Sequence, residues 1–598
     1  MNSEEPITIL LNRLWHHISP HRRGQFTLLL VLILLASFAE ILSIGAVLPF
    51  IGVLTAPDQI FQMTVMQPVI QALKLTESKQ LLLPLTTAFG LAALIAGAMR
   101  LLLLWATTRL SFAAGADLGI SIYRRTLYQQ YAVHCARNSS QVIDGISTKA
   151  NSVIYNIIVP TLTLISSSVM LIAILITLLM VQPVIALTAF GGFGFIYIVI
   201  IRLTRKQLIA DSKCVAREST QVIKSLQEGL GGIRDVLIDG SQATYCQIYQ
   251  NADSILRRTQ GNILFISASP RYGMEALGML LIAALAYFLA QQVGGIAGAI
   301  PILGALALGA QRLLPILQQA YGSWTQINGG RSTLRDTLEL LDQPLPDYVN
   351  EPVGKAIFKQ RITLKQLGFR YAEDAPYVLK KINFTIAKGS RVGFIGETGS
   401  GKSTLLDIIM GLLQPTEGLL QIDGETITQE NHRSWQANIA HVPQAIFLAD
   451  STIAENIAFG IPKNEIDHSR VQRAAQQAQI SESIESWPKQ YQTFVGERGI
   501  RLSGGQRQRI GIARALYKQA NVIIFDEATS ALDNETEQAV MQAIEDLSKE
   551  LTLLIIAHRL TTLKSCTQIV ELSEGCIKRT GSYQEIINQS ITYEIKSK

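Results

Sequence analysis

Long apolar stretches, almost free of charged side chains, recur through the first 340 residues of the chain. Six of them reach the roughly 20 residues that a helix needs to cross the hydrocarbon core of a bilayer. We therefore predict an all-α transmembrane domain of six helices over residues 1–340. The predicted spans cover about 26–54, 83–108, 157–181, 184–204, 268–290 and 296–318.

The polar segments between these spans differ in length. Two long ones, about 109–155 and 205–265, are mostly free of proline, so we expect the spanning helices to continue through them well beyond the membrane. A shorter segment, 58–79, has apolar positions at helical spacing. It predicts either a helix lying flat on the outer membrane surface or an ordinary loop with a few core contacts. Those apolar positions are Ile60, Phe61, Met63, Met66, Val69, Ile70 and Leu73.

Lysine and arginine indicate which side of the membrane each loop faces. They precede the first span and are frequent in the two long segments, whereas the links after the third and fifth spans carry none. Because positively charged loops stay in the cytoplasm, we expect a multi-pass protein with both termini cytoplasmic. The cysteines would then face a reducing compartment. They are Cys135, Cys214, Cys246, Cys566 and Cys576.

The pattern changes after residue 340. Residues 341–356 form a linker in which three prolines disfavour helix. From residue 357 to residue 598, short β-branched runs alternate with helical stretches, which predicts an α/β domain with a largely parallel sheet. This domain includes the C-terminus, which the basic loops place in the cytoplasm, so we expect the domain there.

Composition supports a membrane protein with a water-soluble part. Hydrophobic residues make up 48% of the chain and charged residues only 16%, whereas soluble proteins carry about 25% charged residues. The formal net charge of +6 is modest and fits basic cytoplasmic loops better than a nucleic-acid partner. Five cysteines in 598 residues exclude a disulfide-rich scaffold.

A glycine-rich loop stands between a predicted strand, RVGFI, and a predicted helix, TLLDIIMGLL. In this context the backbone N–H groups of the loop cradle phosphates, Lys402 reaches the β- and γ-phosphates, and the Ser403 hydroxyl ligates Mg²⁺. The motif therefore predicts ATP and Mg²⁺ as cofactors. The loop consists of Gly396, Glu397, Thr398, Gly399, Ser400, Gly401, Lys402, Ser403 and Thr404.

A second acidic motif follows an apolar strand over residues 522–525. Asp526 at the end of that strand can hold Mg²⁺ through water, and Glu527 can polarise the attacking water as a general base. Taken alone, the two acids are weak evidence for a catalytic site, because buried strands often end in acids that cap a helix. Together with the phosphate loop it predicts an ATP-hydrolysing site.

The run LSGGQ lies between these two motifs and begins a helical stretch. With it the chain resembles the ATP-binding cassette (ABC) family over essentially its whole length. The resemblance implies that Tyr371 stacks on adenine, that Gln444 touches Mg²⁺ or the attacking water, and that His558 contacts the γ-phosphate. It also implies an inter-subunit loop at Asp533 and an exporter-specific contact at residues 495–497. The signature residues are Ser503, Gly504, Gly505 and Gln506, after Leu502.

The family resemblance further implies a homodimer. In ABC proteins each ATP lies between the phosphate loop of one cassette and the signature motif of another, and this chain has one of each. We therefore expect a half-transporter with two intact ATP sites in the dimer. Six spans before a fused cassette resemble exporters, with coupling helices expected near residues 134–138 and 241–249.

Arginines inside three predicted spans suggest what is transported. Such a charge costs about 2.5–3.5 kcal/mol at mid-span, so each should face a cavity or a partner. A ring of guanidinium groups in a cavity would bind an anionic head such as a pyrophosphate. Alternatively, each arginine reaches the cytoplasmic headgroups, or one pairs with Glu275 a turn away. These arginines are Arg100, Arg271 and Arg312.

A less specific resemblance concerns the cargo. The stretches SPRYGMEALG and GAQRLLPILQQAY, with segment 58–79, resemble bacterial flippases of lipid-linked oligosaccharides and cyanobacterial exporters of envelope polysaccharide. This implies a lipid-linked oligosaccharide or glycolipid moved across the bacterial cytoplasmic membrane. Other possibilities are a multidrug or lipid exporter, a peptide exporter and an ATP-gated channel.

Overall fold

The computed structural model describes residues 5–55, 57–63, 66–73, 75–181, 183–290, 313–527, 533–545, 550–556 and 563–586. The chain folds into two compact units. One comprises Met1–Gln129 and Arg137–Leu345, and the other comprises Gln130–Ala136 and Pro346–Lys598. We call them the helical unit and the cassette unit.

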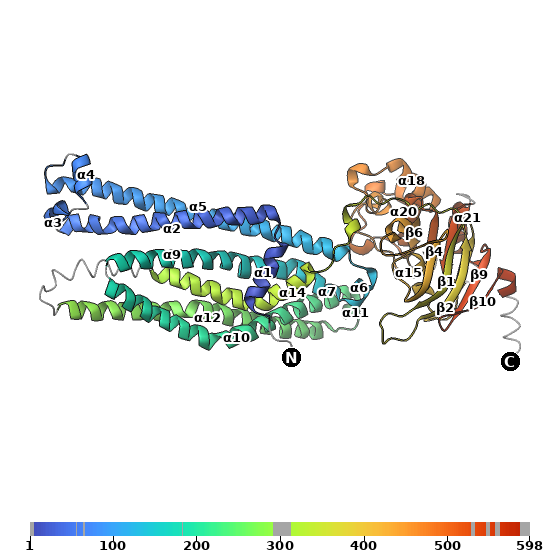
Figure 1. The fold of residues 1–598 in the computed structure, drawn as a ribbon. Helices are drawn as coiled ribbons and strands as arrows, with labels where there is room; N and C mark the ends of the chain where they lie inside the picture. Colours follow the sequence, from blue (N-terminus) through green and yellow to red (C-terminus); the bar gives the residue numbers. More distant parts are fainter. Residues whose placement is uncertain are drawn as a thin grey trace. The chain divides into compact units, whose positions relative to one another are not determined.

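Long helices make up the helical unit, and α2 and α5 run side by side (Figure 1). Their apolar content explains the arrangement, because a long apolar helix must bury its surface in lipid or against another helix. Residues 313–329 are also helical. The main helices are α1 (Ile7–His17), α2 (Pro20–Thr55), α5 (Leu82–Leu127), α9 (Val159–Val181), α10 (Pro183–Gly231), α12 (Gln242–Ala290) and α14 (Arg331–Leu341).

Three helical stretches in the described chain are long and apolar enough to cross a membrane, namely Pro20–Leu54, Ser78–Leu127 and Ser139–Thr177. They overlap the first three predicted spans. The fourth and fifth predicted spans fall within α10 and α12, whose 49 residues each confirm that the helices continue beyond the predicted spans. The sixth, 296–318, lies mostly outside the described residues.

Two short helices, α3 (Pro57–Gln62) and α4 (Gln67–Ala72), lie at one end of α2 and α5 (Figure 1). They are followed by a 3₁₀ turn, η1 (Ser78–Leu81). Ile60 and Ile70 are buried in a small cluster with Val53 and Leu81, whereas Met63 and Leu73 stay exposed. Part of the apolar face predicted in segment 58–79 therefore makes core contacts, and part remains open.

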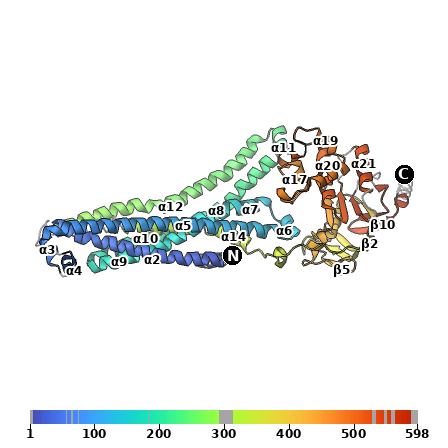
Figure 2. The same cartoon turned by 90° about the horizontal axis from the view of Figure 1, so that it is seen from above.

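At the other end of α5 the chain breaks before the third long helix. Here lie α6 (Tyr131–Ala136), which groups with the cassette unit, and α7 (Ser139–Asp144). The next helix contains two π-helical turns, η2 (Gly145–Lys149) and η3 (Ile154–Ile158), separated by α8 (Ala150–Val153). A shorter helix, α11 (Ile233–Ile238), joins α10 to α12 and lies at the corresponding end of the helical unit (Figure 2).

A buried polar cluster joins these elements. Asp144 is fully buried and accepts hydrogen bonds from the Ser219 and Thr220 hydroxyls of α10, both at 2.8 Å. The Lys149 ammonium lies 3.6 Å from Asp144 Oδ2 and 2.5 Å from Asp336 Oδ2 of α14. The cluster therefore ties the helix after α7 to both α10 and α14.

The cassette unit contains two sheets. The smaller has the order β2-β1-β4-β5 and is antiparallel, and the larger has the order β10-β9-β3-β8-β7-β6. In the larger sheet β9, β3, β8, β7 and β6 are parallel neighbours, which confirms the predicted parallel core, and β10 is antiparallel to β9. The strands are β1 (Arg361–Phe369), β2 (Leu379–Ala387), β3 (Arg391–Ile395), β4 (Glu417–Ile422), β5 (Glu425–Thr426), β6 (Ile439–Val442), β7 (Val522–Asp526), β8 (Thr552–Ile556), β9 (Gln568–Ser573) and β10 (Cys576–Gly581).

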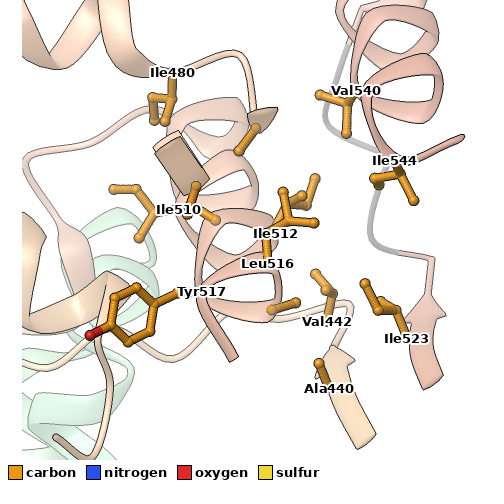
Figure 3. Packing of buried hydrophobic residues seen from close by; sticks show 14 of the residues in the cluster. Ala440, Val442, Ile480, Ile510, Ile512, Leu516, Tyr517, Ile523, Val540 and Ile544 are labelled. Atoms are coloured by element: carbon orange, nitrogen blue, oxygen red, sulfur yellow. The ribbon is translucent and has the colours of Figure 1, made fainter. Parts of the chain in front are cut away.

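Helices pack against these strands and hold the motifs in place. The helix of the phosphate loop is α15 (Lys402–Ile409), and the helix of the signature motif is α20 (Gly504–Lys518). Figure 3 shows Ile512 and Leu516 of α20 packed toward Val442 of β6 and Ile523 of β7. Each such buried side chain contributes about 1.5–3 kcal/mol. The other cassette helices are α16 (His432–Gln436), α17 (Ile453–Ile457), α18 (His468–Gln477), α19 (Ser481–Glu485) and α21 (Asn534–Glu545).

Candidate functional site

The glycine-rich loop joins β3 to α15, as its sequence predicts. Gly396, Gly399 and Gly401 have φ values of +146°, +85° and +97°, which favour glycine. A Cβ atom at Gly396 would lie 2.2 Å from the Leu572 carbonyl oxygen. The loop therefore needs glycine both for its turn and for its close approach to β9.

Lys402 lies at the centre of this loop. Its ammonium group donates to the carbonyl oxygens of Gly396 and Glu397, both at 2.8 Å, and to Ser400 Oγ at 3.5 Å. Burial lowers the pKa of Lys402, while Glu527 and Asp526 act to raise it. The lysine is thus held in the loop at the N-terminus of α15, where the helix dipole also favours an anion.

The two carboxylates at the end of β7 lie close to this lysine. Burial and the neighbouring Glu527 raise the pKa of Asp526. Gln444 Nε2 donates to Glu527 Oε2 at 2.6 Å. The structure therefore brings together Lys402, Asp526, Glu527 and Gln444, which the sequence assigned to one site.

The backbone at Glu527 is in the left-handed region, with φ of +50°. A non-glycine residue in this region stores about 1–3 kcal/mol and is kept there by its surroundings. The Glu527 N–H group donates to the Ile556 carbonyl oxygen of β8 at 3.0 Å. This hydrogen bond holds the Glu527 backbone and the Gln444 amide holds its carboxylate, so the side chain is oriented at both of its ends.

The oxygen donors in this site suit Mg²⁺, which uses one or two carboxylates together with substrate phosphates. The Ser403 hydroxyl is exposed, and Asp526 is half-buried. In the described parts of the chain, no group of three or more His, Cys, Asp or Glu side chains is arranged as a metal site. The residues therefore fit a magnesium ion brought in with a nucleotide.

Tyr371 follows β1 and presents an exposed ring. Its hydroxyl lies 3.2 Å from Thr404 Oγ1 in α15, and its ring meets that of Phe369 edge-on at 5.0 Å. These contacts fix an aromatic ring beside the phosphate loop, where its free face suits stacking on a base.

The signature motif forms the N-terminus of α20. The Ser503 hydroxyl accepts from the Gln506 N–H group at 3.2 Å, and Gln506 Oε1 accepts from the Ser503 N–H group at 2.9 Å. This capping box satisfies two of the N–H groups at the helix start. Gly504 and Gly505 occupy the first turn and leave its backbone accessible.

Asp533 begins α21. It accepts from the Thr536 N–H group at 2.9 Å and from the Thr536 hydroxyl at 2.8 Å, and these bonds lower the pKa of Asp533. His558 and Arg312 lie outside the described residues, so their predicted roles stay predictions.

The remaining two arginines of the predicted cargo site have carboxylate partners. Arg271 pairs with Glu275 at 2.9 Å, which is the alternative that the sequence left open. Arg100 pairs with Glu40 of α2, which the sequence reasoning missed. Glu40 is the one charged residue in the first predicted span, and an ionisable residue within a span is itself a signal of a functional role.

Comparison with known proteins agrees with this site. A family model described as "ABC transporter" matches residues 379–530. The ATP-dependent lipid A-core flippase of Alkalilimnicola ehrlichii is 30% identical over 408 residues, which cover 67% of this chain and 68% of that protein. The chain belongs to the ABC transporter family. Its site and family together show an ATP-hydrolysing translocase.

Further relatives support this assignment. The ATP-dependent lipid A-core flippase of Cupriavidus metallidurans is 28% identical over 489 residues, covering 79% of this chain and 80% of that protein. Heavy metal tolerance factor 1 of Caenorhabditis elegans is 39% identical over 260 residues, covering 44% of this chain and 31% of that protein.

A solved structure shows the same fold. The structure of a bacterial Atm1-family ABC exporter with ATP bound superposes with a TM-score of 0.77 and 23% identity. The match covers 95% of this chain and 96% of that chain. This chain therefore has the fold of an ABC exporter, and together with the family match and the flippase relatives this makes it an ABC half-transporter with an ATP-binding cassette.

Proposed function

We propose that the chain works as a homodimer in the bacterial cytoplasmic membrane and moves an amphipathic lipid across it at the expense of ATP. Both termini and the cassette, residues 357–598, would lie in the cytoplasm, with the transmembrane domain over residues 1–340 and a linker at 341–356. The observation that best supports ATP-driven transport is that Lys402, Gln444 and Glu527 lie together at one phosphate site.

Dimerisation would complete each ATP site. The phosphate loop of one protomer would face the signature motif of its partner, so that Ser503 and the backbone of Gly505 contact the γ-phosphate. Asp533 would then lie in the loop between subunits, and His558 would reach the γ-phosphate from the end of β8. The open first turn of α20 supports this arrangement, because helix N-termini bind anions.

The cargo we propose is a lipid-linked oligosaccharide or another glycolipid. Relatives described as lipid A-core flippases support an amphipathic lipid. Arg100 in the second predicted span supports an anionic head, because guanidinium groups bind phosphate oxygens in pairs. A multidrug or general lipid exporter is the second candidate, since its cavity would need no cation.

Hydrolysis would use the residues of the site in turn. Lys402 would exchange the carbonyl oxygens of its own loop for the β- and γ-phosphate oxygens. Ser403, Gln444 and Asp526 would hold Mg²⁺, which supplies positive charge against the phosphates when it is bound. Glu527, oriented by Gln444, would accept the proton of the attacking water as the water oxygen bonds to the γ-phosphorus and the bond from that phosphorus to the β-phosphate oxygen breaks, which leaves ADP and phosphate.

The short helices at the cytoplasmic end would transmit the movement. We assign the coupling helices to α6 and α11, each of which interrupts the long helices. The first overlaps the segment expected from the sequence, 134–138. The second, Ile233–Ile238, precedes the other expected segment, 241–249, which forms the start of α12.

A substitution tests the assigned general base. Glu527→Gln keeps the shape and the contact with Gln444 but removes the proton acceptor, so kcat for ATP should fall about 10²–10⁴-fold. The Kd for ATP should stay within about twofold, because the carboxylate does not hold the nucleotide. Glu465→Gln, an exposed acid of the same unit, is the matched control and should behave as the wild type. Rapid turnover in Glu527→Gln would refute the assignment.

Transport itself requires a second assay. Purified protein in proteoliposomes should move a fluorescent polyprenyl-pyrophosphate sugar between leaflets only with ATP, and Glu527→Gln should abolish this movement. Movement of a hydrophobic drug alone would favour the second candidate. Downhill ion flux gated by ATP, without net lipid movement, would instead indicate a channel.

A further inference from the structure

An acid and a base face each other between two long apolar helices. Glu40 lies in α2 and Arg100 in α5, sixty positions apart in the sequence. Arg100 Nε donates to Glu40 Oε2 at 2.9 Å, and the second guanidinium nitrogen contacts Glu40 Oε1. The guanidinium therefore contacts both oxygens of the carboxylate, Oε2 through a hydrogen bond and Oε1 as an ion pair.

The two partners differ sharply in burial. The Glu40 side chain is 1% exposed, whereas the Arg100 side chain is 46% exposed. Ser37 and Ser43, one turn to either side of Glu40 on α2, are also buried. The acid thus lies inside the α2–α5 contact, whereas almost half of the base is exposed.

This asymmetry leaves one edge of the guanidinium available. Arginine has five N–H donors, and the fork with a carboxylate uses two of them. An approaching group meets the remaining donors of Arg100 and cannot reach the covered Glu40. The exposed edge therefore offers hydrogen bonds to an anion, while the carboxylate behind it cancels most of the net charge.

Arg100 lies within the second predicted span, about 27 Å along α5 from Leu82 at 1.5 Å per residue. A hydrocarbon core is about 30 Å thick, so the pair would lie toward the far side of the span from Leu82, where a lipid head would enter or leave the core. A lone arginine inside the span would hold an anion tightly and release it slowly. With Glu40 behind it, the same arginine would still meet an anionic oxygen but would hold it less tightly.

We propose that Glu40 is the built-in counter-ion of Arg100 and sets the affinity of this membrane site for phosphate-bearing lipid heads. Glu40 is a positioning residue: it orients the guanidinium with its free edge outward and limits how strongly the anion is held. The biological role of this site rests on the proposed lipid transport, whereas the ion pair and the exposed part of Arg100 are independent of that proposal.

The test measures bound lipid directly. The full-length protein and its variants are placed in nanodiscs of phosphatidylcholine with a minor share of phosphatidic acid, whose head is a phosphomonoester. Lipids retained after mild solubilisation are counted by native mass spectrometry. In Glu40→Gln the guanidinium loses its counter-ion, so retained phosphatidic acid relative to phosphatidylcholine should rise about fivefold.

Further variants separate this role from a structural one. Glu40→Asp keeps the charge and should retain phosphatidic acid much as the wild type does. The double variant Glu40→Gln/Arg100→Gln buries no charge, so it should fold, and its retention should fall to the level of phosphatidylcholine. Glu228→Gln removes an acid from an exposed pair with Lys224 and should change nothing.

Several results would overturn the proposal. Unchanged or reduced retention in Glu40→Gln would show that the acid only stabilises the helix pair. Wild-type retention in the double variant would show that Arg100 does not bind the lipid head. If retention changes as expected but no lipid is moved with ATP, the counter-ion role holds and the proposed transport fails.

Discussion

Replacing Lys149 with Met should destabilise the helical unit through the buried polar cluster. In the wild type, Asp144 has a cation at 3.6 Å and two hydroxyl donors at 2.8 Å. Lys149→Met removes the cation but leaves Asp144 buried. Loss of one partner of a buried pair costs about 3–5 kcal/mol, and we expect the lower end because the Ser219 and Thr220 hydroxyls still solvate the carboxylate.

The second contact of Lys149 adds little to this figure. Asp336 is over a third exposed, so water replaces the lost ammonium there. If the buried carboxylate is the cause, Asp144→Asn introduced into the Lys149→Met variant should recover about 2 kcal/mol, because the amide leaves no charge to bury. The two substitutions should therefore be strongly non-additive.

Thermal unfolding in nanodiscs measures the effect. For a unit of this size 1 kcal/mol corresponds to about 2 °C, so Lys149→Met should lower the melting temperature by about 6 °C. Chemical labelling of Cys214 in a single-cysteine variant follows the unfolding of this unit alone, because Cys214 is half-buried in α10 and its Sγ accepts a hydrogen bond from the Thr259 hydroxyl at 3.5 Å.

Two comparisons distinguish the loss of a buried counter-charge from the loss of a surface charge as the cause of destabilisation. Lys224→Met, which removes an exposed cation from α10, should leave the melting temperature unchanged. An unchanged temperature in Lys149→Met would refute the reasoning. Failure of Asp144→Asn to restore any of the loss would show that the cost lies in packing and not in a buried charge.

Three further substitutions test the cassette. Burial, aided by Asp526, raises the pKa of Asp407 to about 6, so its neutral form is favoured by folding and this stability is lost as pH rises through about 6. Asp407→Asn should therefore stabilise the metal-free protein by about 1 kcal/mol at pH 7.5 and by almost nothing at pH 4 in thermal unfolding. Gly396→Ala should abolish binding of a fluorescent ATP analogue because of the 2.2 Å clash, whereas Gly354→Ala, with open space around it, should bind normally. Trp435→Phe removes the 2.7 Å hydrogen bond from the indole to the Ile409 carbonyl and should cost about 1–3 kcal/mol in urea unfolding.

The local sequence was sufficient to predict those features that depend only on residues close together in the chain. The phosphate loop adopts the strand–loop–helix form that its glycines predict, because backbone freedom at Gly399 and Gly401 is a property of single residues. The long helices likewise follow from apolar length, since a spanning segment must satisfy its backbone internally. The parallel core followed from the alternation of short strands with helices.

Other features depended on contacts between distant segments. The separate antiparallel sheet of β2, β1, β4 and β5 was not predicted, because short strands do not reveal their pairing partners. Segment 58–79 left two interpretations open, and tertiary packing determines only which of its apolar side chains are covered by the rest of the chain. Ile60 is covered by the cluster around Val53, while Met63 at the same apolar spacing is not.

The sequence by itself determined that this protein has apolar spanning helices, a phosphate loop and a signature motif, because each is written in a continuous run of residues. Tertiary structure decided which polar and charged side chains meet. It placed Gln444 against Glu527 across 83 positions and Glu40 against Arg100 across 60. Electrostatic attraction acts through space over a few ångströms, so only the packing of helices and strands determines which side chains come close enough to feel it.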